Sequence, residues 1–159
     1  MSWTEDSAPR RVLLVDDEEI DLTVVAEAVA RLGFHVTATR DPGEAIRLME
    51  RELFDIIISD YIMPGIDGLQ LLRRARHFLP DSIRIILTSS RDFDVAVEAI
   101  NRGEVFRFLR KPLEERELGM SLRIAVQHMV MREEIVELRQ ALMRRDELLK
   151  RLEEARVTP

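Results

Sequence analysis

The stretch that decides the fold class runs from Ile56 to Gly68 and reads IIISDYIMPGIDG. Its first three residues are β-branched and apolar, which is typical of a short strand buried on both faces of a parallel sheet. The strand leads into a carboxylate, Asp60, and a loop with Pro64 and Gly65 follows at once. Ligands of open α/β sheets bind at the carboxyl ends of the strands, so chemistry is expected at Asp60. Taken alone, the same pattern also fits an aspartate that only caps a loop.

Strand and helix patterns alternate along most of the chain. Asp41-Pro42 is an N-cap candidate followed by proline at the first helical position, and Gly33 and Gly103 lie just past two helix ends. Five strand–helix units in succession imply right-handed crossovers and parallel pairing. The sequence therefore predicts an α/β fold with a doubly wound, five-stranded parallel sheet. The predicted strands are residues 12–15, 35–39, 56–60, 84–88 and 105–109, and the predicted helices are residues 18–32, 41–52, 68–77 and one that Asp92 or Asp94 caps and that reaches Asn101.

Polar side chains stand at the ends of four of these strands. Asp16 and Asp17 follow the first and Asp60 ends the third, whereas Thr88 ends the fourth and Lys111 follows the fifth. Because the carboxyl ends of parallel strands meet at one edge, we expect these side chains to converge. Two carboxylates 4 Å apart repel by roughly 4 kcal/mol at an effective dielectric near 20, so three of them need a cation. With oxygen ligands only, and neither Cys nor His nearby, the fitting ion is Mg²⁺, with Mn²⁺ as the alternative.

A carboxylate beside Mg²⁺, an ammonium and a hydroxyl is suited to stabilising a phosphoryl group in transfer. The arrangement suggests Asp60 as the nucleophile, because carboxylates are known to form covalent aspartyl phosphate. From about Arg11 to the helix after Pro112, the chain resembles the receiver domain of a two-component response regulator. The residues that carry the resemblance are Asp16-Asp17, Asp60 with Met63-Pro64 and Gly68, Thr88, Phe108 and Lys111-Pro112.

The resemblance implies a flavodoxin-like (βα)5 fold and assigns a role to each site residue. Asp60 would accept a phosphoryl group from a histidine kinase or a histidine phosphotransfer protein. Mg²⁺ would be held by Asp17, Asp60 and the backbone carbonyl of Ile62, and Asp16 would reach the ion largely through water. Phosphoryl transfer and hydrolysis would be autocatalytic, and no output enzyme is expected in this chain.

The resemblance also implies a conformational switch. Lys111 would pair with the phosphoryl oxygens, and Thr88 would hydrogen-bond them after transfer and draw its loop inward. Phe108 would then turn into the space that Thr88 leaves. The peptide bond between Lys111 and Pro112 would be cis. The change would be signalled through the face built by the fourth helix, fifth strand and fifth helix, around residues 96–108.

Two features depart from the common family pattern. The switch aromatic, Phe108, is often a tyrosine in relatives, so no hydroxyl is available here to lock the inward state. Ile62 and Ser90 flank the site where some relatives carry polar or acidic side chains that orient a hydrolytic water. We therefore expect slow dephosphorylation. A phosphoryl lifetime of only seconds, unchanged in Ile62→Asn, would contradict this expectation.

The helical pattern that follows Pro112 does not stop where a receiver should end. We predict a flexible tail over residues 1–10, a receiver over 11–127, a coiled-coil extension over 128–156 and a tail over 157–159. The preferred interpretation of the extension is a parallel two-stranded coiled coil that makes a homodimer, with Glu134 and Arg139 placed to pair across it. A solvated single helix is the alternative. The apolar heptad positions are Ile135, Leu138, Leu142, Leu149 and Leu152, and Arg145 interrupts them at a d position.

Composition narrows the setting. The net charge of −6 argues against direct contact with nucleic acid, and no apolar run reaches the ~18 residues of a membrane span. The absence of cysteine suits a cytoplasmic protein. Output would therefore pass through a downstream protein partner or a missing output domain.

Two other function classes stay open at this point. A phosphatase of the haloacid-dehalogenase type uses the same residue types, but it places its nucleophile after the first strand as Asp-x-Asp, where this chain has Asp16-Asp17-Glu18. A silent receiver that serves only as a coiled-coil adaptor is the other. Turnover of p-nitrophenyl phosphate would support the first, and failure to label with acetyl phosphate would support the second.

Overall fold

The computed structural model describes residues 8–89 and 92–157. Its strands are β1 (Arg11–Val15), β2 (His35–Thr39), β3 (Ile56–Asp60), β4 (Ile83–Thr88) and β5 (Arg107–Arg110). They pair in the order β2-β1-β3-β4-β5, and every pairing is parallel. The predicted doubly wound, five-stranded parallel sheet with the flavodoxin-like fold is confirmed. The flexible tails that were predicted around it fall largely on residues 1–7 and 158–159, outside the described residues.

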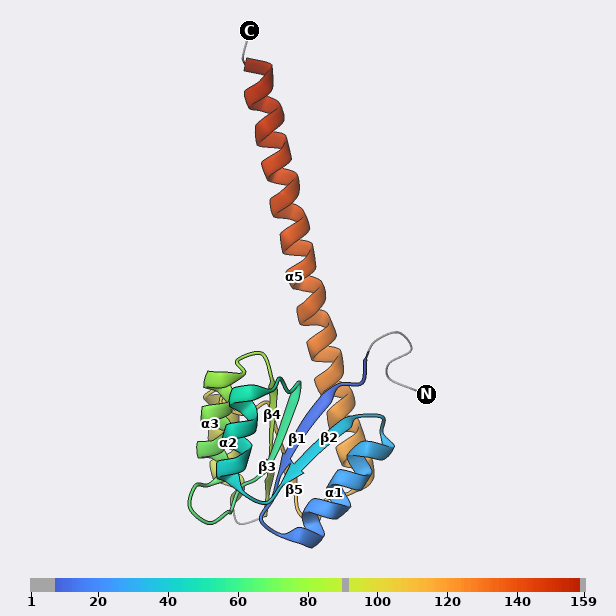
Figure 1. Ribbon diagram of the computed structural model, residues 1–159, viewed down its shortest axis with the longest axis vertical. Helices are drawn as coiled ribbons and strands as arrows, with labels where there is room; N and C mark the ends of the chain where they lie inside the picture. The colour runs from blue at the N-terminus through green and yellow to red at the C-terminus, as the bar shows by residue number, and fades with distance from the viewer. Residues whose placement is uncertain (1–7, 90–91, 158–159) are drawn as a thin grey trace. The chain divides into compact units, whose positions relative to one another are not determined.

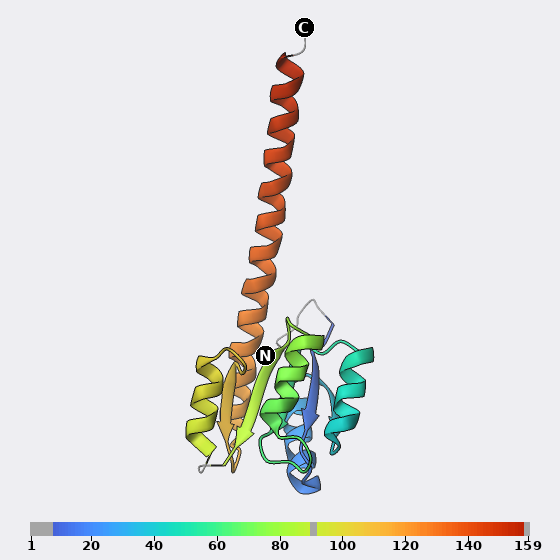
Figure 2. The same cartoon turned by 90° about the vertical axis from the view of Figure 1, so that its left-hand side faces the viewer.

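Helices cover both faces of the sheet (Figures 1 and 2). On one face lie α2 (Pro42–Arg51), α3 (Gly68–Phe78) and α4 (Phe93–Asn101), and on the other lie α1 (Glu19–Arg31) and the start of α5 (Glu115–Val157). The central strands are therefore buried on both sides. The side chains of Leu13, Leu14, Ile57 and Ile58 are fully buried, although they alternate between the two faces. This double burial explains why these strands are almost wholly apolar in sequence.

Local sequence signals set most of the element boundaries. Asp41 caps α2 by accepting a hydrogen bond from the Gly43 backbone N–H at 2.8 Å, with proline at the first helical position as predicted. Asp67 and Gln70 form a capping box at the start of α3. Gly33 and Gly103 follow α1 and α4 with positive φ angles of 91° and 69°. Such angles favour glycine, which is why these helices end there.

Two boundary predictions need correction. Asp92 is the N-cap residue of α4, but its side chain makes no capping bond and accepts a hydrogen bond from Ser89 Oγ at 2.8 Å instead. The last strand pairs from Arg107 to Arg110, two residues later than predicted at its start, because its ladder with β4 begins opposite Ile85. Val105, predicted to be in the strand, is buried in the core just ahead of it.

Gly68 fixes the loop that follows Asp60. A Cβ atom at this position would collide with the carbonyl oxygen of Asp60 and come within 2.8 Å of the Ile86 side chain. The Gly68 N–H also donates a hydrogen bond to the Tyr61 carbonyl at 2.7 Å. The first turn of α3 can therefore lie directly against the end of β3, which holds Asp60 and its loop in place.

The predicted long C-terminal helix is present. α5 is 43 residues long, and the chain divides within it into two compact units, residues 1–122 and 123–159. In the first unit, Leu118 and Leu122 are buried. In the second unit, the apolar heptad residues are all about half exposed or more: Ile135, Leu138, Leu142, Leu149 and Leu152. The domain boundaries at residues 127 and 128 stay a prediction.

Candidate functional site

Three predicted carboxylates meet at the carboxyl edge of the sheet. Asp16 and Asp17 follow β1, Asp60 ends β3, and one oxygen from each lies within 4.8 Å of the others. Asp16 is fully buried and Asp60 is 8% exposed. Adjacent parallel strands that end at the same level bring these side chains together, as the sequence indicated. Their mutual repulsion makes the group a candidate cation site.

The Lys111 ammonium lies among these carboxylates. Its Nζ is 2.9 Å from Asp16 Oδ2, 3.0 Å from Asp21 Oδ2 and 3.3 Å from Asp60 Oδ1. The predicted cis peptide bond to Pro112 is present, and the Lys111 backbone N–H donates to the Thr88 carbonyl at 2.9 Å. The lysine is thus held at the sheet edge from its backbone as well as from its side chain.

Asp21 is a site residue that the sequence reasoning missed. It belongs to the first turn of α1 and lies four residues after Asp17. That spacing is the signal that could have found it, because the helix begins directly after the carboxylate pair and returns toward it after one turn. Its contribution raises to three the number of carboxylates that contact Lys111.

The residues present fit a hard divalent cation. Oδ1 of Asp17 is buried and, within the described part of the chain, has no hydrogen-bond partner. A buried carboxylate oxygen without a partner is costly, and a cation would remove that cost. The candidate ligands are all oxygen atoms, the type that Mg²⁺ prefers. Ile62 follows in the loop with an exposed side chain, and the role of its carbonyl as a ligand stays a prediction.

Burial and neighbouring charges shift the ionisation of the site. Burial raises the pKa of Asp60 to about 6, and the negative charge of Asp16 adds to this effect. The charge of Lys111 and the N–H of Tyr61 oppose it. Burial by itself lowers the pKa of Lys111, but hydrogen bonds to Asp16 and Asp21 and the charge of Asp60 raise it overall. Lys111 is therefore a permanent cation beside an acid that titrates at mildly acidic pH.

The two predicted switch residues lie on neighbouring strands. Thr88 is 2% exposed at the end of β4, and its hydroxyl donates to the Ser89 carbonyl at 3.1 Å. Phe108 is half-buried in β5, with its ring edge-on to Phe93 at a centroid distance of 5.2 Å. The Arg110 guanidinium lies over the Phe93 ring, 5.5 Å from its centroid. No pattern in the sequence indicated that Phe93 would contact the switch aromatic. The predicted flanking residue Ser90 lies outside the described residues.

A comparison with protein families matches residues 12–123 to the response regulator receiver domain. The chain belongs to this family. Receivers of this family take phosphoryl groups from histidine kinases, and the predicted resemblance to a two-component receiver is confirmed. Family membership favours this interpretation over the haloacid-dehalogenase alternative.

Two curated relatives are longer proteins that contain a segment similar to this chain. The DNA-binding transcriptional regulator NtrC of Azospirillum brasilense is 35% identical over 107 residues, which are 67% of this chain and 22% of the relative. Protein PetR of Rhodobacter capsulatus is 36% identical over 112 residues, which are 70% of this chain and 46% of the relative. The chain thus spans less than half the length of either relative.

Solved structures give the same result. The signal receiver domain of an HD domain-containing protein from Pseudomonas fluorescens aligns with a TM-score of 0.73 at 33% identity, covering 80% of this chain and 94% of that one. A structure of adenylate cyclase from Rhodopirellula baltica aligns with a TM-score of 0.71 at 29% identity, covering 90% of this chain and 98% of that one.

Within the described residues, no helix has the length and apolar character needed to cross a membrane.

Proposed function

We propose that this receiver is phosphorylated on Asp60 by a histidine kinase or a histidine phosphotransfer protein, with Mg²⁺ held by Asp16, Asp17, Asp60 and the Ile62 carbonyl. One observation carries the proposal: Asp60 lies 3.3 Å from the Lys111 ammonium, within a carboxylate cluster that contains an unpartnered buried oxygen. Bound Mg²⁺ would supply positive charge to offset the carboxylates and the phosphoryl oxygens.

The transfer forms one bond and breaks one. A carboxylate oxygen of Asp60 attacks phosphorus, an O–P bond forms, and the P–N bond to the donor's imidazole breaks. The electron pair of that bond stays on the imidazole nitrogen. Because its pKa is raised, Lys111 stays protonated, and its positive charge stabilises the charge on the transferred phosphoryl oxygens. Thr88, at the end of the adjacent strand, donates a hydrogen bond to one of these oxygens afterwards.

The signal then leaves the site through the aromatic switch. When the Thr88 hydroxyl turns to the phosphoryl group, it gives up its present bond to the Ser89 carbonyl. Phe108 turns inward and its edge-on contact with Phe93 is lost. Both residues belong to elements of the predicted signalling face, β5 and the first turn of α4. A downstream protein or an attached output domain would read the altered face.

The second part of the proposal concerns the helix beyond residue 122. Its apolar heptad residues are 48–64% exposed, which is the state of a coiled-coil seam without its partner helix. We propose that a second copy of the chain covers this seam in a parallel dimer, with Glu134 of one helix facing Arg139 of the other. The solvated single helix remains the competing arrangement.

Phosphorylation and dimerisation are tested separately. Incubation with acetyl phosphate and Mg²⁺ should add one phosphoryl group to the intact protein by mass spectrometry, and Asp60→Asn should add none. Unchanged mass in the wild-type protein would contradict the proposal and revive the silent adaptor. Light scattering with and without beryllofluoride, a mimic of the phosphoryl group, should give the mass of a dimer in at least one state. A monomer in both states would favour the single helix.

A further inference from the structure

The ammonium of Lys111 is shared among more carboxylates than phosphoryl binding requires. Its two shortest contacts are to Asp16 and Asp21, at 2.9 and 3.0 Å, and its contact to Asp60 is the longest at 3.3 Å. An ammonium group has three N–H donors. Hydrogen bonds to Asp16 and Asp21 use two of them, and Asp60 is held by the longer ion-pair contact, so a phosphoryl oxygen competes with these carboxylates for the ammonium.

Burial indicates which contact is displaced. The Asp16 side chain is 1% exposed and its other oxygen accepts a hydrogen bond from the Glu18 N–H at 3.0 Å, so releasing it would leave a buried charge. Asp60 carries the phosphoryl group itself. The Asp21 side chain is 44% exposed, and water can take the place of the ammonium there at little cost. Asp21 is thus the partner that Lys111 releases most readily.

We propose that Asp21 is a positioning residue that competes with the phosphoryl group on Asp60 for the Lys111 ammonium. The inference rests on the proposed phosphorylation of Asp60. Without a phosphoryl group, Asp21 holds the lysine toward α1. When the group arrives, Lys111 leaves Asp21 and turns to the phosphoryl oxygens. Asp21 therefore favours the unphosphorylated state and sets how strongly the site holds its ligand.

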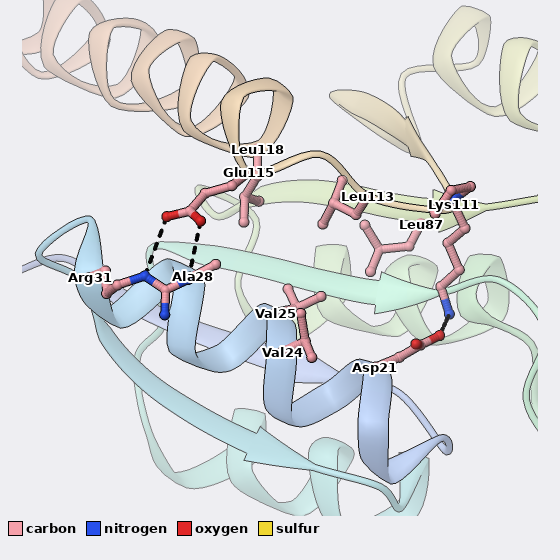
Figure 3. A pocket seen from close by; sticks show the side chains of 11 residues that line it. Asp21, Val24, Val25, Ala28, Arg31, Leu87, Lys111, Leu113, Glu115 and Leu118 are labelled. Carbon is pink, nitrogen blue, oxygen red and sulfur yellow. Dashed lines mark hydrogen bonds and ion pairs between the residues drawn. The ribbon is translucent and has the colours of Figure 1, made fainter.

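The Lys111–Asp21 pair also closes one end of a pocket between α1 and the start of α5 (Figure 3). The pocket has a volume of about 630 Å³, and Arg31 and Glu115 form the ion pair at its other end. Between the two pairs the walls are mainly apolar, with Val25 and Leu87 among them. When Lys111 releases Asp21, one of the two ion pairs at the ends of the pocket is broken. Because Asp21 belongs to α1, this helix is the element affected by the direction in which Lys111 points.

The test compares Asp21→Asn with a matched control. Glu19→Gln removes the same charge from the same helical turn, but Glu19 pairs with Arg40 at 3.6 Å instead of Lys111. Beryllofluoride binding is titrated at saturating Mg²⁺ on the full chain. Asp21→Asn should bind about two- to fivefold more tightly than wild type, as expected for release of a partly exposed ion pair. Glu19→Gln should change binding much less, and Asp21→Glu should restore wild-type affinity.

A spectroscopic readout separates positioning from a structural role. The ¹H–¹⁵N signal of the Lys111 side chain should shift on beryllofluoride binding in wild type, and in Asp21→Asn the free protein should already be shifted toward the bound position. Equal or weaker binding by Asp21→Asn, or equal tightening by Glu19→Gln, would overturn the role of Asp21. A wild-type protein that binds no beryllofluoride would instead refute phosphorylation of Asp60, and the inference with it.

Discussion

The two parts of this chain use the same kind of residue in opposite ways. In residues 8–122, apolar side chains such as Leu72 are fully buried between sheet and helices. In residues 123–157, Leu138 and Leu142 recur at regular helical spacing but are 64% and 50% exposed. Apolar periodicity therefore predicts a buried face, but it does not say whether the covering surface belongs to the same chain. The receiver buries its own apolar side chains, whereas the helix leaves an apolar face exposed.

Asp60→Asn should have the largest effect, and it should be confined to the receiver. The amide cannot act as the phosphoryl acceptor, so labelling by acetyl phosphate should be lost completely. The mass of the unphosphorylated protein in light scattering should not change, because Asp60 is far in sequence from the heptad residues. Labelling at the wild-type rate would place the acceptor elsewhere and contradict phosphorylation of Asp60.

Leu142→Glu should produce the reverse result. A charge buried in a coiled-coil seam costs several kcal/mol, and each 1.4 kcal/mol is about tenfold, so the dimer should weaken by at least about 100-fold. Labelling of Asp60 should stay intact. Gln140→Glu is the matched control, because it adds the same charge at an outward heptad position. If both variants sediment like wild type, the exposed face is not a dimer seam.

The pH dependence of stability should distinguish Asp60 from the rest of the receiver. Its pKa is raised from 3.8 to about 6 by burial, so the stability that the protonated group contributes is present below pH 3.8 and lost as pH rises through 6. In chelator at pH 7.5, Asp60→Asn should therefore be more stable than wild type by on the order of 3 kcal/mol. Denaturant unfolding at pH 7.5 and pH 4 measures this.

The gain from Asp60→Asn should shrink toward zero at pH 4, where wild-type Asp60 is largely protonated. Mg²⁺ at pH 7.5 should stabilise the wild-type protein, because a ligand that binds only the folded state raises its stability. A gain that is independent of pH would assign the effect to packing and not to the buried charge.

Arg145→Leu should give the smallest effect, a stronger association of the C-terminal helices. Arg145 stands at a d position between Leu142 and Leu149, where a second apolar residue would extend the seam. The association constant should rise about tenfold, since a buried leucine replaces a charge that interrupts the heptads. Analytical ultracentrifugation over a dilution series measures it. Unaltered or weaker association would mean that the helices do not pair in the predicted heptad frame.

Much of the receiver was predictable from the sequence for a physical reason. Parallel strands end at one edge, so strand-terminal residues such as Asp16, Asp60 and Lys111 could be placed together without knowing any side-chain conformation. Asp21 and Phe93 were missed because their roles depend on where a neighbouring side chain points. Lys111 could have contacted Asp60 alone, and Phe108 could have packed on other neighbours. Strand order constrains the backbone, but it does not choose among such contacts.

The glycines carry a consequence for sequence variation. Gly65 and Gly103 have positive φ angles of 88° and 69°, with no atom near a prospective Cβ, so asparagine should be tolerated at both. Gly68 has no such freedom, because any side chain there meets the carbonyl of the residue proposed to be phosphorylated. In a saturation-mutagenesis scan, Gly68, which has no reactive group of its own, should therefore tolerate substitution as poorly as Asp60. Its depletion should come from lost folding and not from lost chemistry.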